Sequence, residues 1–335
     1  MTRPHAQVAY VISEATQIGQ VRRAATLLAR EQGLDETDAG RLALVATEAA
    51  SNVLKHARGG ELLLRPLRQD DNRGVELLAL DRGPGMADLA ACFRDGYSTA
   101  GSPGTGLGAV RRLSERSDVY SAPDLGTALL AEIWARPPRP RPVEYGVVCQ
   151  PIRGEIVPGD DWIIHADAAR AVALLADGLG HGALAAAAAE AASALVTAHR
   201  DSPPRDLLQR AHAALRGTRG AAVAAAELDL AAQTLDYAGI GNVSGTIVAL
   251  QGSRSLLSHN GTVGLEARRI QQLSYPFARG SLLVMHSDGL RTRWNLADYP
   301  GLLQRHPALI AGVLYRDFSR KRDDVTVLAL REAAA

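Results

Sequence analysis

The sequence predicts an α+β protein made of two domains. The chain has 335 residues, and at roughly 150 residues per domain this is enough for two hydrophobic cores. A proline-rich stretch, "ARPPRPRPVEYG" at 135–146, interrupts the chain near its middle. Before this stretch, helices are followed by consecutive strands, and after it many short strands alternate with a few helices. These observations predict a two-layer α/β sandwich followed by an α/β/β/α sandwich.

The proline-rich stretch marks the predicted domain boundary. Four prolines fall within the six residues 137–142. Proline blocks helices and sheet ladders and favours extended polyproline II, as expected of a semi-rigid spacer. We therefore predict domains at 1–136 and 144–335, joined by a linker at 137–143.

The first domain begins with a strand in "AQVAYVIS" and continues with two helices, at 17–32 and 35–57, of which the first is ended by Gly33. Further strands are predicted at 61–67, 75–81, 117–121 and 127–134, and a further helix at 105–115. Because strands follow one another directly, the pattern favours a two-layer sandwich over a parallel βαβ sheet.

The second domain is rich in strands. They are predicted at 145–151, 161–165, 171–177, 221–230, 234–239, 244–250, 281–287 and 324–330. Helices are predicted at 181–199, 204–216 and 305–318. Strands in this number, with helices outside them, predict the α/β/β/α sandwich.

Composition narrows the classes of function. Lys and Arg number 37 against 36 Asp and Glu, so no overall field attracts nucleic acid or an anionic membrane. The two cysteines have no metal-type spacing, which fits a reducing compartment. The start carries no secretion signal, and the most apolar run, at 182–196, is too short and alanine-rich to span a bilayer. We expect a cytoplasmic protein that binds neither nucleic acid nor membrane.

A polar stripe lies on the second predicted helix, in "LALVATEAASNVLKHA". Glu48, Asn52 and His56 recur every four residues and so share one side of the helix. A surface stripe of an amphipathic helix has the same pattern. Asparagine is a poor helix former, however, and its place beside a packed face favours a site.

Two glycine-rich turns could complete such a site. In "LLALDRGPGM" an apolar strand ends at Asp81, whose carboxylate can accept from an amino group such as that of adenine, and passes into a flexible turn. In "GYSTAGSPGTGLGAVRRL" (96–113) glycines precede and open a helix, where free amides can hold phosphate. The second turn matches neither a Walker A loop nor a Rossmann turn.

Together, these three pieces resemble the Bergerat (GHKL) ATP-binding fold, and residues 6–136 resemble the RsbT-type serine/threonine kinases of bacterial partner-switching pathways, relatives of anti-sigma factors. The resemblance implies ATP and Mg²⁺ as cofactors. It implies that Asn52 coordinates Mg²⁺, that Glu48 is the general base for the substrate hydroxyl, and that Asp81 reads adenine. The residues implied to line the nucleotide are Gly83, Gly85, Gly104, Gly106, Gly108 and Thr127. Phosphoryl transfer needs mainly an aligned metal and a positioned base, and this set offers both.

Acids recur at strand ends in the second domain. They stand in "VPGDDWIIHA", "AVALLADGLGHG", "LLVMHSDGL" and "KRDDVTVLAL". Each alone is typical of ordinary turn chemistry. Because an ionised Asp is costly in a core, acids at four strand ends are either exposed separately or gathered around cations. Oxygen ligands without cysteine suit Mg²⁺ or Mn²⁺ rather than zinc.

The order of these motifs, with "YAGIGN" at 237–242 between them, resembles that of the SpoIIE/RsbX branch of PP2C-like phosphatases over residues 145–331. The resemblance implies two Mn²⁺ or Mg²⁺ ions, held by Asp160, Asp177, Gly178 (through its carbonyl), Asp288 and Asp323, with Asp324 as an alternative to Asp323. Asp177 would bridge the ions, which activate a water for in-line attack on phosphorus. His181 is either a proton donor near this site or a histidine with a local hydrogen bond.

The two resemblances imply a bifunctional regulator. Its kinase and phosphatase would act on STAS-domain antagonist proteins of a sigma-factor or stress-signalling pathway, with a sigma factor or a signalling enzyme as a further partner, and the chain could form a homodimer. An alternative is an N-terminal domain that only binds nucleotide or sequesters a partner and regulates the phosphatase. The sequence also allows an inactive C-terminal scaffold, against which the four acids argue, or a metabolic enzyme that acts on a small phosphorylated molecule.

Overall fold

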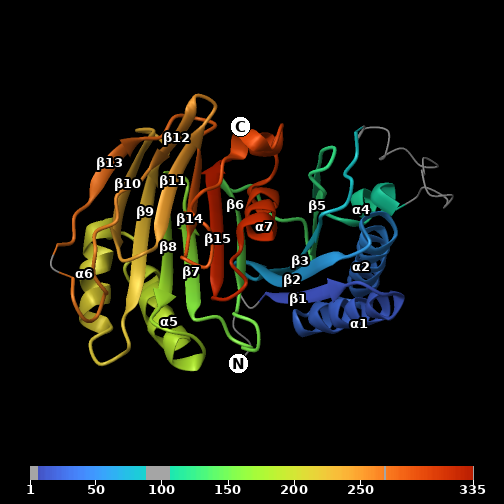
Figure 1. Cartoon of the computed structure of the whole chain (residues 1–335), viewed down its shortest axis with the longest axis horizontal. Helices are drawn as coiled ribbons and strands as arrows, with labels where there is room; N and C mark the ends of the chain where they lie inside the picture. Colours follow the sequence, from blue (N-terminus) through green and yellow to red (C-terminus); the bar gives the residue numbers. More distant parts are fainter. Residues whose placement is uncertain (1–6, 88–105, 268, 335) are drawn as a thin grey trace. The chain divides into compact units, whose positions relative to one another are not determined.

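The computed structural model describes residues 7–87, 106–267 and 269–334. The chain forms two compact units, shown in Figure 1. The first contains Met1–Pro140 together with Asn295–Arg316, and the second contains Arg141–Trp294 together with Asp317–Ala335. The segment Asn295–Arg316 thus belongs to the first unit although it follows most of the second unit in the sequence. The predicted boundary at 137–143 does not account for this return of the chain.

The first unit is built on one antiparallel five-stranded sheet in the order β1-β2-β3-β5-β4. The strands are β1 (Val8–Ile12), β2 (Gly60–Gln69), β3 (Asn72–Asp81), β4 (Arg116–Ser121) and β5 (Thr127–Trp134). The helices are α1 (Ala15–Glu31), α2 (Glu36–Ala57) and α4 (Gly106–Leu113).

Local signals set the ends of the helix that carries the polar stripe. The Asp35 side chain accepts a hydrogen bond from the amide of Asp38 at 2.8 Å and so caps the start of α2. Arg58, with φ 58°, ends the helix in the left-handed conformation. Helices α1 and α2 then cover one face of the sheet, where Leu42, Val45 and other apolar residues form the core.

The second unit contains two five-stranded sheets, in the orders β13-β10-β9-β8-β7 and β12-β11-β14-β15-β6. The strands are β6 (Val143–Gln150), β7 (Asp160–Ala166), β8 (Arg170–Gly178), β9 (Ala221–Asp229), β10 (Thr234–Ile240), β11 (Ser244–Ala249), β12 (Gly252–Ser255), β13 (Leu273–Pro276), β14 (Leu282–His286) and β15 (Val325–Glu332). The helices of the second unit are α5 (Ala183–Ala198) and α6 (Pro204–Ala214). The short 3-10 turns at Leu296–Asp298 and Leu302–Gln304 lie in the segment Asn295–Arg316 of the first unit, in which α7 (Pro307–Phe318) also begins. Helix α7 divides at Arg316, and its earlier residues belong to the first unit.

Two apolar layers hold the second unit together. One lies between the sheets and includes Trp162, Tyr237 and Met285. The other lies between the first of these sheets and helices α5 and α6, and its alanines allow a close approach of helix to sheet. The predicted α+β class is confirmed, and the predicted helices and strands of the described residues are present, apart from shifts of a few residues at their ends. The sequence does not predict β12 and β13, which are only four residues long. Among the described residues, no helix has the length and apolarity needed to cross a membrane.

Candidate functional site

The first unit brings the residues of the polar stripe to the start of a glycine-opened helix. At Gly106, the first residue of α4, a β-carbon would lie 3.1 Å from Glu48 Oε2 and 3.3 Å from Asn52 Nδ2. The side chains of Glu48 and Asn52 therefore point at this helix start, where Gly108 also lies. A carboxylate and an amide beside the main-chain amides of a helix N-terminus form a set that can position a phosphate and its metal ion.

Asp81 is fixed by two different turns. Its Oδ1 accepts hydrogen bonds from the amides of Gly83 at 2.8 Å and Thr127 at 3.1 Å. Among the described residues, none donates a hydrogen bond to Oδ2 of Asp81, so this oxygen can accept from a ligand such as the amino group of adenine. Burial raises the pKa of this carboxyl, while the two amides, Arg316 and His56 oppose the rise.

The turn after Asp81 depends on glycine. Gly85 has φ 71°, and a β-carbon there would lie 1.9 Å from the carbonyl oxygen of Ala122. Gly83 lies against Ala57 near the end of α2. The structure therefore places Glu48, Asn52, Asp81 and their glycine neighbours in one unit, whereas Gly104 lies outside the described residues.

The second unit brings acids from separate strand ends together. Asp160, the first residue of β7, lies directly opposite Asp177 on β8. The main-chain amide of Asp288 favours the ionised form of the Asp177 carboxyl, and the Asp288 carboxylate lies close enough to Asp323 to raise the pKa of that carboxyl. Residues 160, 177, 288 and 323 thus form a carboxylate cluster, to which we refer as the acid cluster.

Burial and mutual repulsion make the acid cluster unfavourable without a cation. Desolvation raises the pKa of Asp177, and the charges of Asp160, Asp288 and Asp323 raise it further. Desolvation also raises the pKa of Asp160, and the charges of Asp324 and Asp323 raise it further. Asp160 is only 1% exposed, and no described residue makes a hydrogen bond with its Oδ1.

These observations fit a divalent cation of the Mg²⁺ or Mn²⁺ type, because the available donors are all oxygen atoms and one of them is buried and unpaired. Within the part of the chain that the structure describes, no group of three or more His, Cys, Asp or Glu has the geometry of a formed metal site.

Two polar residues to which the sequence analysis assigned no role donate hydrogen bonds to the acid cluster. Ser287 donates from its hydroxyl to Asp160 Oδ2 at 2.7 Å, and Asn242 donates from its amide to Asp288 Oδ2 at 2.7 Å. Both fall inside quoted motifs: Ser287 precedes Asp288, and Asn242 ends "YAGIGN". Their places in these motifs are the signal that could have identified them.

The neighbouring candidates differ in their environment. Asp324 is 3% exposed and accepts a hydrogen bond from the amide of Ile152 at 2.8 Å, which ties it to a loop. Asp323 instead interacts with Asp288. The exposed His181 ring pairs with Glu155 at 2.8 Å, a residue 26 positions earlier in the chain.

The close packing of the chain at the end of β8 requires glycine. A β-carbon on Gly178 would lie 2.1 Å from the carbonyl oxygen of Ala185. The main chain after Asp177 therefore runs directly against the start of helix α5. Only glycine permits this approach at the position whose carbonyl is implied as a metal ligand.

Comparison with known proteins identifies both halves. Residues 11–132 match the family described as "Histidine kinase-like ATPase domain", and residues 167–332 match the family "Stage II sporulation protein E (SpoIIE)". Serine/threonine-protein kinase RsbT of Bacillus subtilis (strain 168) is 31% identical over 109 residues, which cover 32% of this chain and 82% of that protein. Phosphoserine phosphatase RsbX of the same organism is 24% identical over 178 residues, which cover 52% of this chain and 87% of that protein.

The fold of the second half is also found in a crystal structure of RsbX in complex with magnesium. The two share a TM-score of 0.54 at 21% identity, over 58% of this chain and 98% of that one. The fold and the matches define a histidine kinase-like ATPase domain fused to a PP2C-type phosphatase domain. The first half of the chain belongs to the family of RsbT-like ATPase domains, and the second half matches the SpoIIE family over residues 167–332.

Proposed function

We propose that this chain sets the phosphorylation level of a protein substrate through two opposing activities. The second unit hydrolyses phosphoserine or phosphothreonine with the help of two Mn²⁺ or Mg²⁺ ions, and the first unit transfers phosphate from ATP to serine or threonine. The substrates are STAS-domain antagonist proteins, as in partner-switching pathways. The observation that carries the proposal is the acid cluster.

The acid cluster supports the hydrolase half through its chemistry. Bound divalent ions would supply an activated water and neutralise the phosphate charge. In this proposal Asp160, Asp177, Asp288 and Asp323 hold the ions, the carbonyl of Gly178 joins them, and Ser287 keeps Asp160 oriented through its hydrogen bond. The likeness to RsbX, whose crystal structure contains magnesium, agrees with this ion type.

The kinase half is supported by the arrangement of the first unit. Asn52 would hold Mg²⁺, and Asp81 would accept from adenine. Glu48 lies beside Asn52 at the start of α4, where it could take the proton of a substrate hydroxyl. The similarity of residues in this half to RsbT, a serine/threonine-protein kinase, points in the same direction.

A second candidate function keeps the phosphatase and makes the first unit a nucleotide-binding regulator. It is favoured by one observation: residues of the C-terminal segment Asn295–Arg316 pack into the first unit and reach the main chain of Asp81. Binding alone would not need a general base, whereas phosphate transfer would.

A phosphotransfer assay separates these functions. The full chain is incubated with labelled ATP and a STAS-domain protein from the same genome, as wild type, Glu48→Gln, Asn52→Ala and Asp177→Asn. We expect Asn52→Ala to lose nucleotide binding and transfer, and Glu48→Gln to bind nucleotide without transfer. Asp177→Asn should transfer phosphate but fail to remove it.

The outcomes discriminate clearly. If wild type binds ATP but labels no STAS protein, and still dephosphorylates the phosphorylated form with Mn²⁺, the second candidate function replaces the kinase. If Asp177→Asn dephosphorylates as fast as wild type, the assignment of the acid cluster is wrong.

A further inference from the structure

A segment from the C-terminal part of the sequence covers the second face of the first unit's sheet. Side chains alternate between faces along β3, so Leu77 and Ala79 join the core under α1 and α2 while Leu78 and Leu80 face the other way. A β-carbon on Gly312 would lie 2.8 Å from Leu78 Cδ2 and 2.9 Å from Leu80 Cδ2. Helix α7 therefore packs directly onto this face of β3.

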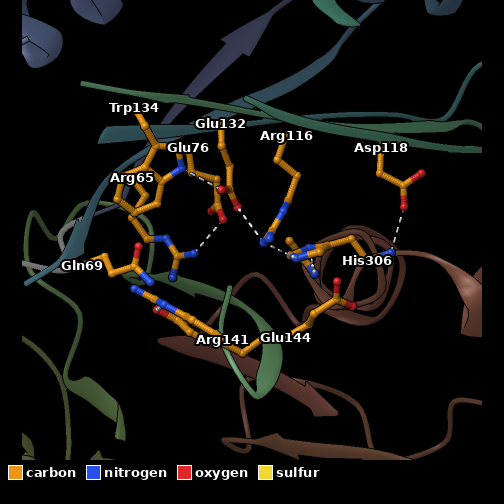
Figure 2. Close-up of polar contacts among 12 residues, drawn as sticks. Arg65, Gln69, Glu76, Arg116, Asp118, Glu132, Trp134, Arg141, Glu144 and His306 are labelled. Carbon is orange, nitrogen blue, oxygen red and sulfur yellow. Dashed lines mark hydrogen bonds and ion pairs between the residues drawn. The ribbon is translucent and has the colours of Figure 1, made fainter. Parts of the chain in front are cut away.

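Polar contacts fix the same segment at the edge of the sheet. Figure 2 shows Arg116 beside His306, at 3.3 Å, and Asp118 accepting a hydrogen bond from the amide of His306, at 2.8 Å. The rings of Tyr120 and Tyr299 meet edge to face, with centroids 6.5 Å apart. The segment is thus attached to β4 as well as to β3.

The last residue of this segment reaches the candidate nucleotide site. Arg316 is 6% exposed. Its Nη1 donates to the carbonyl oxygen of Asp81 at 2.6 Å, and its Nη2 donates to the carbonyl oxygen of Leu125 at 2.8 Å. One planar guanidinium therefore joins the end of β3 to the turn that precedes β5.

These two carbonyls flank the groups that orient the Asp81 side chain. The turn at Leu125 leads to Thr127, whose amide donates to Asp81 Oδ1. At Gly126, between them, a β-carbon would lie 2.8 Å from Arg316 Nη1, so glycine leaves the space that the guanidinium fills. Arg316 thus holds in place both the main chain of Asp81 and the turn that fixes its carboxylate.

The charge of Arg316 also helps to keep the Asp81 carboxyl in the form that accepts a hydrogen bond. Burial raises the pKa of the Asp81 carboxyl, and the nearby guanidinium lowers it. An ionised carboxylate accepts hydrogen bonds and donates none, which is the form that an adenine amino group requires.

We propose that Arg316 is a positioning residue of the nucleotide site: it holds the carbonyls of Asp81 and Leu125 so that the Asp81 carboxylate can select adenine. The inference rests on the nucleotide binding proposed above. The nucleotide site then needs a residue of the C-terminal half of the sequence, and this requirement sets the chain apart from an ATPase domain that is complete within residues 1–136.

A comparison of ADP with IDP binding distinguishes a role of Arg316 in positioning Asp81 from a general role in stabilising the fold. Hypoxanthine carries an oxygen where adenine carries the amino group, so IDP lacks the donor that Asp81 would accept. A misplaced Asp81 carboxylate weakens ADP binding more than IDP binding. A general loss of structure weakens both by the same factor.

The test measures the affinity of the full chain for Mg·ADP and Mg·IDP by calorimetry, in wild type, Arg316→Ala, Arg316→Lys and Arg305→Ala. Arg305 is the matched control, because it lies in the same segment and pairs with Asp118 at 3.3 Å, on β4. We expect Arg316→Ala to weaken ADP binding by about tenfold or more, the size typical of lost charge-assisted hydrogen bonds, and to reduce the preference for ADP over IDP. Arg305→Ala should bind both nucleotides like wild type.

Arg316→Lys keeps the charge but lacks the planar fork that reaches two carbonyls, so it should recover part of the ADP preference. If thermal unfolding shows that Arg316→Ala does not fold, the comparison of Arg316→Lys with wild type tests the inference instead. Unchanged ADP affinity in the Arg316 variants, or an equal loss for ADP and IDP, would overturn the inference while leaving the nucleotide site intact. A wild-type chain that binds neither nucleotide would overturn the proposed nucleotide binding and this inference with it.

Discussion

Asp160 and Asp177 occupy facing positions on neighbouring antiparallel strands, an arrangement that brings two like charges together. Like charges placed directly opposite each other destabilise a strand pair. Burial raises the pKa of both carboxyls, and the charge of Asp160 raises that of Asp177 further. At the scale of single residues, the acid cluster therefore lowers the stability of the fold, which is the property expected of groups placed for a ligand.

Replacement of Asp177 should separate activity from stability. Asp177→Asn removes one charge from the acid cluster, so the metal-free variant should be more stable than metal-free wild type by about 1–3 kcal/mol, since one pKa unit corresponds to about 1.4 kcal/mol. Hydrolysis of p-nitrophenyl phosphate with Mn²⁺ should fall by about 100-fold or more. Urea unfolding and steady-state kinetics measure the two effects. A variant that loses activity by losing its fold would contradict the expectation.

The acid cluster also predicts how stability depends on pH when metal is removed. The native pKa of Asp160, Asp177 and Asp323 lies above the unfolded value of about 3.9, first because of burial. The native state then binds more protons than the unfolded chain, and the contribution of these groups to the free energy of unfolding falls as pH rises above about 4. Urea midpoints in a chelator, from about pH 4 to about pH 8, should drop more steeply for wild type than for Asp177→Asn.

Saturating Mn²⁺ should reverse this trend, because the ion binds the ionised carboxylates and only in the native state. Equal pH slopes for wild type and Asp177→Asn in the chelator would show that the acids do not interact in solution.

Glycine substitutions test how the elements approach one another. Gly178→Ala would bring a β-carbon to 2.1 Å from the main chain of Ala185, at the start of α5. Because main-chain atoms cannot move aside cheaply, we expect a loss of about 1–3 kcal/mol in the free energy of unfolding and weaker Mn²⁺ binding. Chemical unfolding and calorimetry would detect these changes. Unchanged Mn²⁺ affinity would mean that the end of β8 does not help to place the ion.

Gly40 provides the matched control for this substitution. It lies inside helix α2 and is exposed, and apart from its chain neighbours and the backbone of its own helix, no atom of the described residues lies within 4 Å of its β-carbon position. Gly40→Ala should therefore raise the free energy of unfolding by about 0.5–1 kcal/mol, because alanine is the better helix former. A destabilised Gly40→Ala would contradict the assignment of this position to an open helix surface.

The two compact units do not follow the order of the sequence. The segment Asn295–Arg316 belongs to the first unit, where it covers Leu78 and Leu80. A fragment of residues 1–140 should therefore expose this apolar face, and burial of one leucine contributes about 1.5–3 kcal/mol. Amide hydrogen exchange in β3 should be faster in the fragment than in the full chain, and a peptide of residues 295–316 should restore part of the protection. Equal protection without the peptide would show that the segment adds no stability to the first unit.

Local patterns in the chain are sufficient for much of this architecture. Helix and strand periods, the Asp35 cap and the left-handed end of α2 act over a few residues, so the α+β class and nearly all the elements could be predicted. The strand-end acids and the Glu48–Asn52 spacing were recognisable because a strand or helix carries each into a defined position. The short strands β12 and β13 were not predictable, because four residues hold too little periodicity.

Contacts between residues that are distant in the sequence could not be predicted from such local patterns. The pairing of Asp160 with Asp177, the hydrogen bonds of Ser287 and Asn242, and the reach of Arg316 to Asp81 join positions 17 to 235 residues apart. Side-chain packing and hydrogen-bond geometry decide these contacts only after the sheets have formed, because they depend on which strand ends meet in space. For this reason the kind of chemistry could be predicted from local residues, while the residues that orient it became visible only in the folded chain.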